Sequence, residues 1–517
     1  MNTRAVLFLL GCVGLIMAAF LLVPVGVSLA FGAVPEAGAF ALSSLTSAVL
    51  SGALAWRYRG ATERDGRLNF FRREGLAAVG LCWILGALLG ALPFAYTGFL
   101  DPVDAVFESA SGLTTTGSTI LTGAHFELLP EYPGLAFWRS FTHWIGGVGI
   151  VLVFVVLFPT GGRSLFRSEV PGVSREASAQ RVRDSAITLI KIYVGLTAVQ
   201  MVLLVFAQQS SPLASQPGQE WGLGMHVYEA ALHSFGTLAT GGFSNHGGSI
   251  QDFDSYGVEL VILVFMFLAG INFAFYDLGL RNGLRDMWRA LVRSTEVHVY
   301  VGLIVVSVGL ISLVLWFWGG IDGHESMDYS SLTHALRSSS FLVVSLQTST
   351  GYGTHNFDQW PEFTKVLLMF LAFVGATAGS TGGGLKVIRF LILAKASWRG
   401  VRRFARPRAV YTVRLSGESL DEGIVASVVG YCGMWVLLFL GGTLAITALQ
   451  GIELTSAATS VLATLNNIGP GLNLVGPAEN FGFFNDVSKL LLSMFMILGR
   501  LELYAILVLL TPRFWKQ

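Results

Sequence analysis

The sequence predicts an all-α polytopic membrane protein in which two N-terminal helices precede four copies of one helical repeat. Composition is the first observation: 53% of the 517 residues are hydrophobic and only 13% are charged, whereas soluble domains carry about 25% charged residues. The second is a set of ten apolar segments, each long enough to cross a bilayer. The third is a shorter, semi-polar segment that recurs four times between them.

The ten apolar segments match the roughly 20 residues that a transmembrane helix requires. The first resembles a secretion signal because Arg4 precedes an apolar run. That run continues to about Ala33, beyond the roughly 7–15 residues of a signal's apolar core, so we expect a retained membrane helix. The segments lie at 5–30, 38–56, 75–97, 136–158, 186–207, 258–280, 298–318, 361–396, 423–449 and 487–511.

The four semi-polar segments are too short to cross the bilayer and too apolar to be solvated loops. Irregular backbone at membrane depth is tolerated only where it is buried in protein or lines a cavity. We therefore predict that these segments are re-entrant and meet inside the protein. They cover residues 102–117, 226–241, 332–351 and 455–469.

Lys and Arg residues gather in every second connection between the apolar segments. Cytoplasmic loops are enriched in these residues, so we expect these connections and both termini to be cytoplasmic. The re-entrant segments then open to the outside, where acids such as Asp101 and Asp252 would concentrate cations. Alternatively, acids simply remain where bases are excluded. The basic connections cover 57–73, 163–191, 281–293 and 386–414.

Each re-entrant segment ends in small residues around a glycine, and these glycines recur at intervals of 110 to 124 residues. Each glycine follows an apolar span and a short helix-like segment and precedes another span, which is the order of an M1-P-M2 pore-loop repeat. We therefore divide the chain into a two-helix extension (1–60) and four repeats around a central pore, at 70–160, 184–283, 297–397 and 421–512.

Four such turns around one axis would have the chemistry that selects potassium. The ion must exchange its water shell for oxygen atoms, which a ring of backbone carbonyls supplies, and glycine reaches the backbone angles this requires. Half-helices ending at the turns add negative potential from their C-termini. Ordinary glycine turns outside the membrane are the alternative. The predicted filter residues are Thr115, Thr116, Gly117, Thr240, Gly241, Thr350, Gly351, Asn467, Ile468 and Gly469, with K+ at Thr116, Gly117, Thr240, Gly241, Thr350, Gly351, Ile468 and Gly469.

Three further motifs carry a family resemblance. They are the run from Trp144 to Ile150 (WIGGVGI), the run from Ala378 to Lys386 (AGSTGGGLK) and the run from Gly499 to Glu502 (GRLE). With the four glycine turns, they make the chain resemble the TrkH/KtrB superfamily of potassium transporters over essentially its whole length, and the TrkH branch most closely. His143 replaces an expected glutamine and Thr377 a common cysteine.

The resemblance implies a potassium-uptake protein of the bacterial cytoplasmic membrane. Gly117 stands where sodium-preferring plant relatives carry serine, so potassium is the implied ion. A homodimer is also implied, together with a cytosolic TrkA-type ring of nucleotide-binding subunits that docks on the basic loops 163–183 and 396–414. Those loops are equally suited to anionic membrane lipid. The chain has no nucleotide-binding motif of its own and no nucleic-acid motif, so any nucleotide would bind the other subunit.

The second helix of the third repeat is too long to be straight. Its 36 residues, 361–396, would extend about 54 Å at ~1.5 Å per residue, against a hydrocarbon core of ~30 Å. Five glycines between Gly375 and Gly384 predict a break near mid-membrane. By resemblance, this stretch is a gate under the filter, and a passive kink is the alternative. The gate residues are Gly379, Ser380, Thr381, Gly382 and Gly383, together with Arg500.

Arg500 lies deep in the last apolar segment, where a charge costs ~2.5–3.5 kcal/mol and must face water or a partner. We predict that it faces the pore below the filter and opposes permeating cations. The alternative is an ion pair with Glu502 or another acid. Glu108 and Glu229, in the first two re-entrant segments, either anchor the filter backbone or point outward to solvent.

Two other functions are weaker matches. A sodium- or proton-coupled symporter would need carboxylates at mid-membrane, yet few acids other than Asp277 and Glu502 lie inside the apolar segments. An embedded enzyme would need a nucleophile and a base that meet, but His143, His233 and His355 each sit beside a re-entrant segment without such a partner. The lone cysteines Cys12, Cys82 and Cys432 suggest neither a disulfide nor a metal cluster.

Overall fold

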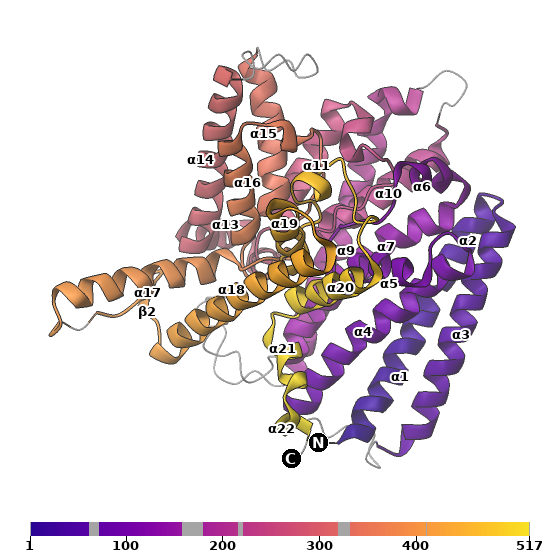
Figure 1. The fold of residues 1–517 in the computed structure, drawn as a ribbon, viewed down its shortest axis with the longest axis horizontal. Coiled ribbons are helices and arrows are strands. Elements are labelled where there is room, and N and C mark those ends of the chain that lie inside the picture. The colour runs from indigo at the N-terminus through magenta and orange to yellow at the C-terminus, as the bar shows by residue number, and fades with distance from the viewer. Residues whose placement is uncertain are drawn as a thin grey trace.

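The structure is a computed structural model that describes residues 2–61, 72–157, 179–215, 221–318, 331–409 and 411–515. It is a helical bundle, which confirms the predicted fold class (Figure 1). Most of the basic loop 163–183, up to residue 178, lies outside the described residues.

The helices fall into successive groups along the chain. The extension holds α1 (Thr3–Phe20), α2 (Leu22–Ala30) and α3 (Val34–Tyr58). The next two groups are α4 (Arg72–Tyr96), α5 (Pro102–Leu113), α6 (Gly123–Leu128) and α7 (Pro133–Leu157), and then α9 (Ala179–Ala207), α10 (Leu223–Leu238), α11 (Tyr256–Ala269), α12 (Phe273–Asn282) and α13 (Leu284–Arg293).

The second half repeats this order with a small hairpin inserted. It holds α14 (Thr295–Trp318), α15 (Leu332–Gln347), α16 (Glu362–Val374) and α17 (Val387–Ala405), then the antiparallel strands β1 (Arg414–Leu415) and β2 (Glu418–Ser419). The last group is α18 (Glu422–Gln450), α19 (Leu454–Leu465), α20 (Asp486–Arg500), α21 (Tyr504–Leu507) and α22 (Pro512–Trp515). Short 3-10 turns lie at Arg59–Ala61, Leu129–Glu131, Gln208–Ser210, Pro212–Ser215, Ser249–Phe253, Phe357–Gln359, Asn473–Val475 and Val508–Leu510.

Small residues let the N-terminal helices pack closely, as is common in membranes. A Cβ atom added to Gly11 would lie 2.6 Å from the Ala55 amide nitrogen, and one added to Gly14 would lie 2.0 Å from the Ser51 hydroxyl oxygen. The backbones of α1 and α3 therefore touch, which a larger side chain at either glycine would prevent.

Among the described residues, six helices are long and apolar enough to cross a membrane, and α11 with α12 forms one further, bent candidate. Ten spans were predicted, and the second helices of the repeats account for much of the difference because several are interrupted. The predicted break in 361–396 is confirmed, since α16 ends at Val374 and α17 begins at Val387. The six candidates are Thr3–Ala30, Val34–Tyr58, Glu74–Tyr96, Ala186–Ser210, Thr295–Phe317 and Glu422–Gln450.

Two segments predicted as continuous spans are broken. The segment 258–280 bends by 86° between α11 and α12, where the Asn272 side chain accepts a hydrogen bond from the Ala274 amide and caps the new helix. The segment 487–511 stops at Arg500, because Glu502 and Leu503 adopt left-handed backbone with φ of 56° and 54°. Apolar composition alone did not reveal either break.

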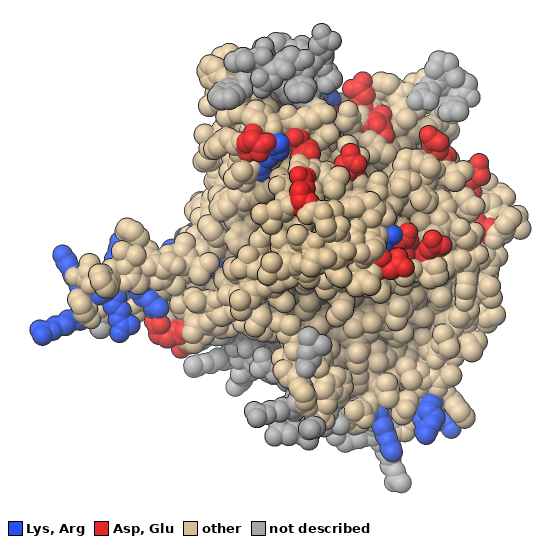
Figure 2. All heavy atoms as spheres, viewed as in Figure 1, with Lys and Arg blue, Asp and Glu red and all other residues tan. Residues whose placement is uncertain are grey.

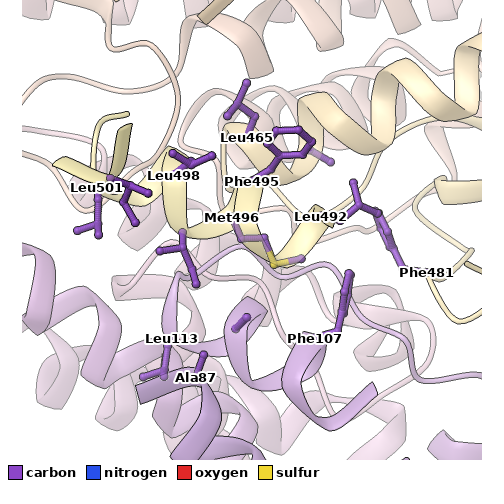
Figure 3. Close-up of a cluster of buried hydrophobic side chains, with 14 of the residues drawn as sticks. Ala87, Phe107, Leu113, Leu465, Phe481, Leu492, Phe495, Met496, Leu498 and Leu501 are labelled. Atoms are coloured by element: carbon purple, nitrogen blue, oxygen red, sulfur yellow. The ribbon is translucent and has the colours of Figure 1, made fainter. Parts of the chain in front are cut away.

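The first and last repeats pack against each other. Figure 3 shows Phe107 of α5 beside Phe481 and near Leu492 of α20, within one cluster of buried side chains. The rings of Phe107 and Phe481 lie 5.7 Å apart. This contact brings the two ends of the repeat series together.

Charge divides over the surface as the sequence predicted. Figure 2 shows most visible Asp and Glu residues over the upper part of the molecule. Lys and Arg lie along the lower edge and on the projecting arm that contains α17.

Candidate functional site

The four half-helices α5, α10, α15 and α19 end in the same turn. At each end, the second residue past the helix cap donates its amide to the carbonyl five residues earlier, which is the Schellman motif. The donor and acceptor pairs are Thr116 and Ser111 (2.9 Å), Gly241 and Gly236 (2.7 Å), Thr350 and Ser345 (2.8 Å), and Ile468 and Ala463 (2.9 Å).

The residue before each donor has left-handed backbone, although none of the four is glycine. These residues are Thr115, Thr240, Ser349 and Asn467, with φ between 53° and 57°. Left-handed backbone costs an ordinary residue about 1–2 kcal/mol, and such strain persists only where the surroundings impose it. The same strained turn in all four repeats indicates that its shape is required.

A glycine with positive φ follows each turn, and its position corrects the predicted register in the second repeat. Gly117, Gly351 and Gly469 have φ of 84°, 82° and 99°, but the matching glycine is Gly242, with φ of 82°, and not Gly241. Gly241 instead corresponds to Thr116, Thr350 and Ile468. Two adjacent glycines made the sequence ambiguous, and only the backbone conformation distinguishes them.

These glycines join the four turns into a closed ring. A Cβ atom added to Gly117 would lie 2.2 Å from the Gly241 carbonyl oxygen, and one added to Gly242 would lie 2.0 Å from that of Thr350. Each turn therefore presses on a carbonyl of the next repeat. The other two contacts join Gly351 to the Ile468 carbonyl (2.0 Å) and Gly469 to the Thr116 carbonyl (3.1 Å).

Side chains reinforce the contact between the first and fourth turns. The Ser118 hydroxyl donates to the Gly469 carbonyl at 2.8 Å, and the Asn467 amide donates to the Thr116 hydroxyl at 2.8 Å. A cavity of about 300 Å³ borders the ring on the side of the residues that follow the turns. It is lined by Gly117, Gly242, Gly351 and Gly469, among others.

Glu108 anchors the backbone beyond the first turn and does not point outward. Its carboxylate is buried and accepts hydrogen bonds from the Ile120 amide at 3.1 Å and from Arg139 Nε at 2.8 Å. Arg139 also donates to the Ser244 carbonyl of the second repeat at 2.8 Å. One buried ion pair thus fixes segments of two repeats, and burial makes such a pair costly to break.

Glu229 occupies a comparable buried place in the second repeat. Its buried carboxylate accepts a hydrogen bond from the side-chain Nδ2 of Asn245 at 2.5 Å, and His246 Nε2 lies 3.3 Å away. Both partners follow the second turn. Of the two predicted alternatives, hydrogen bonding to backbone next to the filter is observed for Glu108, whereas Glu229 is buried and holds side chains that follow the second turn.

The histidines weighed as catalytic residues have structural partners. His143 Nδ1 donates to the Gly112 carbonyl at 2.7 Å, and its Nε2 accepts from the Phe243 amide at 3.2 Å, so the ring joins the first two repeats. His233 contacts the Glu229 carbonyl and the Ser244 hydroxyl. Within the described part of the chain, no three His, Cys, Asp or Glu residues form a metal-binding group.

The twelve residues between α16 and α17, 375–386, form an intramembrane loop on the other side of the ring. The Gly383 amide donates to the Ser349 hydroxyl at 2.5 Å. A Cβ atom added to Gly383 would lie 2.2 Å from the Asn466 carbonyl oxygen. The Thr381 hydroxyl donates to the Leu238 carbonyl at 2.9 Å. The loop therefore contacts the C-terminal ends of three half-helices.

The break between α11 and α12 holds the other edge of this loop. Because α11 ends there, its last carbonyls have no helical partner, and Thr377 supplies two hydrogen bonds to the Gly270 carbonyl, from its amide (3.2 Å) and its hydroxyl (2.9 Å). The Phe273 amide donates to the Gly379 carbonyl at 3.1 Å. We call residues 269–273 the cradle. A glycine and a capping asparagine in the sequence could have indicated it.

Glu296, at the start of α14, is a further buried contact of the loop that the sequence analysis missed. Its carboxylate accepts a hydrogen bond from the Ala378 amide at 2.7 Å. The loop is thus fastened by side chains or backbone from the second, third and fourth repeats.

Arg500 is buried and bonds to backbone carbonyls. It donates to the Thr381 carbonyl of the loop at 2.8 Å and contacts the Gly146 carbonyl at 3.4 Å. The alternative of an ion pair with Glu502 is wrong, because Glu502 pairs with Arg389 at 2.5 Å. Lys386 donates to the Gly382 carbonyl. Two positively charged side chains, Arg500 of α20 and Lys386 of the loop itself, therefore donate hydrogen bonds to carbonyls of the loop.

Comparisons with known proteins show the family of this chain. The TrkH family model, described as a cation transport protein, matches residues 83–517. The Trk system potassium uptake protein TrkH of Escherichia coli (strain K12) is 37% identical over 525 residues, covering 100% of both chains. The TrkH protein of Vibrio parahaemolyticus is 35% identical over 517 residues, covering 98% of each chain.

A solved structure resembles the whole fold. The crystal structure of the potassium transporter TrkH from Vibrio parahaemolyticus matches with a TM-score of 0.84 and 31% sequence identity, covering 100% of both chains. The matches in sequence and in fold both extend over the four turns and the intramembrane loop. The chain therefore belongs to the TrkH family of cation transport proteins.

Proposed function

We propose that this protein carries potassium into the cell through the ring of four turns. The observation that supports this most directly is the closed cycle of contacts in which each turn glycine touches a carbonyl of the next repeat. Such a ring offers backbone oxygens from four sides to one dehydrated cation. The relatives from Escherichia coli and Vibrio parahaemolyticus are named as potassium uptake proteins, which supports the choice of ion.

The filter in this proposal comprises the predicted residues together with Gly242. The oxygens of Thr116, Gly241, Thr350 and Ile468 occupy equivalent positions, one residue before the positive-φ glycines. The half-helices end at the filter, so their C-terminal dipoles favour a cation there. The buried pairs of Glu108 and Glu229 with neighbouring side chains hold the backbone beyond the turns in place.

The intramembrane loop is the proposed gate, and Arg500 is its electrostatic barrier. Thr381, Gly382 and Gly383 lie against the half-helix ends, so an ion leaving the ring would have to displace them. The Arg500 charge is attached to the same loop through the Thr381 carbonyl. A fixed positive charge in a low-dielectric site opposes a passing cation strongly.

The membrane potential is sufficient to drive uptake. Moving one charge through 100 mV releases about 2.3 kcal/mol, which favours entry of a cation toward the basic, cytoplasmic side. We place the protein in the bacterial cytoplasmic membrane with both termini inside, and the separation of acids from bases supports this orientation (Figure 2).

Regulation and assembly are proposed to involve other chains. A cytosolic TrkA-type ring would supply nucleotide control, because the sequence has no nucleotide-binding motif. The projecting arm offers a surface for a second copy: Phe404 of α17 is 91% exposed and Val401 beside it is 58% exposed. A homodimer would cover this apolar face.

Growth of a potassium-uptake-deficient bacterium at low potassium tests the transport proposal. The wild-type protein, expressed with its partner, should restore growth, whereas Asp at Gly117, Gly242, Gly351 or Gly469 should abolish it because the side chain enters the ring. Gly451→Asp is the matched control, since Gly451 also has positive φ (65°) but faces open space. Good membrane expression without growth rescue by the wild type would reject the proposal.

A further inference from the structure

The bend in the second repeat turns the chain away from the direction of α11. α11 has 14 residues and rises about 21 Å, which is less than the ~30 Å hydrocarbon core. The chain then turns by 86° into α12, so with α11 crossing the membrane steeply, α12 would run roughly along the membrane plane. Gly283 reverses the chain with φ of 96°, and α13 packs back on α12, where Met287 faces Gly279.

α13 presents an apolar stripe that no described residue covers. Leu284, Trp288 and Val292 recur every four residues, so they share one side of the helix, and their exposed fractions are 74%, 67% and 50%. The neighbouring side of α13 is different, because Met287 and Leu291 pack against the protein core. The apolar side chains of α13 therefore extend from Met287 and Leu291, which contact the core, to the exposed stripe.

A basic stripe runs beside the apolar one. Arg285, Arg289 and Arg293 also recur every four residues, next to Trp288 and its neighbours. Asp286 is the single acid of α13 and lies 3.4 Å from Arg289. A short helix with Trp and Leu on one face and Arg on the next has the composition of helices that lie in a membrane interface.

We propose that α13 is a membrane-surface helix that recognises anionic phospholipid in the inner leaflet. Leu284, Trp288 and Val292 lie at the boundary between headgroups and acyl chains, where Trp is favoured. The three arginines face the lipid phosphates, because basic residues are attracted to the anionic inner leaflet. The positive charge of the basic stripe matches the anionic leaflet, and the apolar stripe beside it matches the edge of the acyl chains.

The same hairpin touches the gate, and this second step depends on the proposed transport function. α12 begins at the cradle, where Asn272 packs on Gly379 and the Phe273 amide donates to the Gly379 carbonyl at 3.1 Å. When α13 is held at the membrane surface, α12 and the cradle that contacts the closed loop are therefore held in place as well. Anionic lipid would stabilise this docked state and lower the flux.

Nitroxide spin labels on α13 test the lipid contact without any transport assay. Cysteines at Leu284, Val292 and Arg289 would be labelled one at a time, in a variant whose three native cysteines are alanine, and placed in phosphatidylglycerol-containing vesicles. Labels at 284 and 292 should collide mainly with oxygen, which concentrates in lipid. A label at 289 should collide mainly with a water-soluble relaxation agent. Equal access of that agent to all three positions overturns the proposal.

Hydrogen exchange of the unmodified protein keeps the test independent of the labels. In nanodiscs, the amides of α13 should exchange more slowly with phosphatidylglycerol than with phosphatidylcholine alone. If protection of α13 appears only when a cytosolic partner protein is added, the stripe binds protein and the lipid proposal is wrong. If inorganic phosphate in neutral nanodiscs gives the same protection, an anion site replaces the lipid site.

Ion flux tests the coupling to the gate. In vesicles with phosphatidylglycerol, the triple variant R285Q/R289Q/R293Q should conduct more than wild type, and the two should be equal in neutral vesicles. Arg281→Gln is the control, because Arg281 pairs with Asp277 on α12 and lies outside the stripe. Unchanged lipid dependence in the triple variant rejects the coupling. Absence of flux in every sample would count against transport and leaves the label result valid.

Discussion

The four turns of the ring are alike, whereas the second helices that follow them along the chain differ from each other. The four turns share one hydrogen-bond pattern and one left-handed residue, with φ within a few degrees. The second helices differ from each other: α7 is continuous, α11 and α12 meet at 86°, α16 and α17 flank a loop of twelve residues, and α20 ends at Arg500.

The difference follows from what each region must do. Surrounding one ion with oxygens needs equal contributions from every side, so the turns keep the same geometry. Blocking and releasing a path needs one movable element and fixed neighbours to hold it. The third repeat supplies the loop, the second supplies the cradle, and the fourth supplies Arg500. In the proposed function, the symmetric turns therefore select the ion and the asymmetric second helices control its passage.

Gly242→Ala should have the largest effect, because it breaks the symmetric region. The added Cβ would lie 2.0 Å from the backbone carbonyl of Thr350, which cannot move without displacing the next turn. We expect rubidium uptake to fall to background. Gly451→Ala carries the same left-handed cost of ~1 kcal/mol but meets open space, so it should transport normally. Normal uptake by both variants would contradict the ring.

Arg500→Ala should have the next largest effect, in the opposite direction. It removes the positive charge and the hydrogen bond to the Thr381 carbonyl, and we expect rubidium flux in vesicles to rise roughly tenfold, or ~1.4 kcal/mol. Arg500→Lys keeps the charge and should rise less. A flux that is unchanged or lower in Arg500→Ala, and also after deletion of Gly379 to Gly383, would contradict the gate.

Thr377→Val should have the smallest effect and sharpens the role of the cradle. It removes one of two hydrogen bonds to the Gly270 carbonyl, a loss of about 1 kcal/mol. The open population and the flux should then rise severalfold, with ion selectivity unchanged. Thr377→Ser retains the hydroxyl and should match wild type. If serine and valine give equal flux, the cradle does not hold the loop through this bond.

The sequence predicted the symmetric region better than the asymmetric one. The half-helices, their terminal turns and the break near Gly375 could be predicted because segment length, internal repetition and glycine content can be read directly from the sequence. The choice of Gly242 over Gly241 could not, since the two differ only in backbone conformation. The partners of Arg500 and Glu296 are carbonyl and amide groups of distant segments, and any sequence provides such groups everywhere.

The contact between the first and last turns has a consequence for biosynthesis. Ser118 and Gly469 are 351 positions apart, yet their hydrogen bond joins the ends of the series. Chains are made from the N-terminus, so three quarters of the circle can form while the fourth side is still missing. A nascent chain or a truncated product therefore has no closed ion path, and only the finished polypeptide can become permeable.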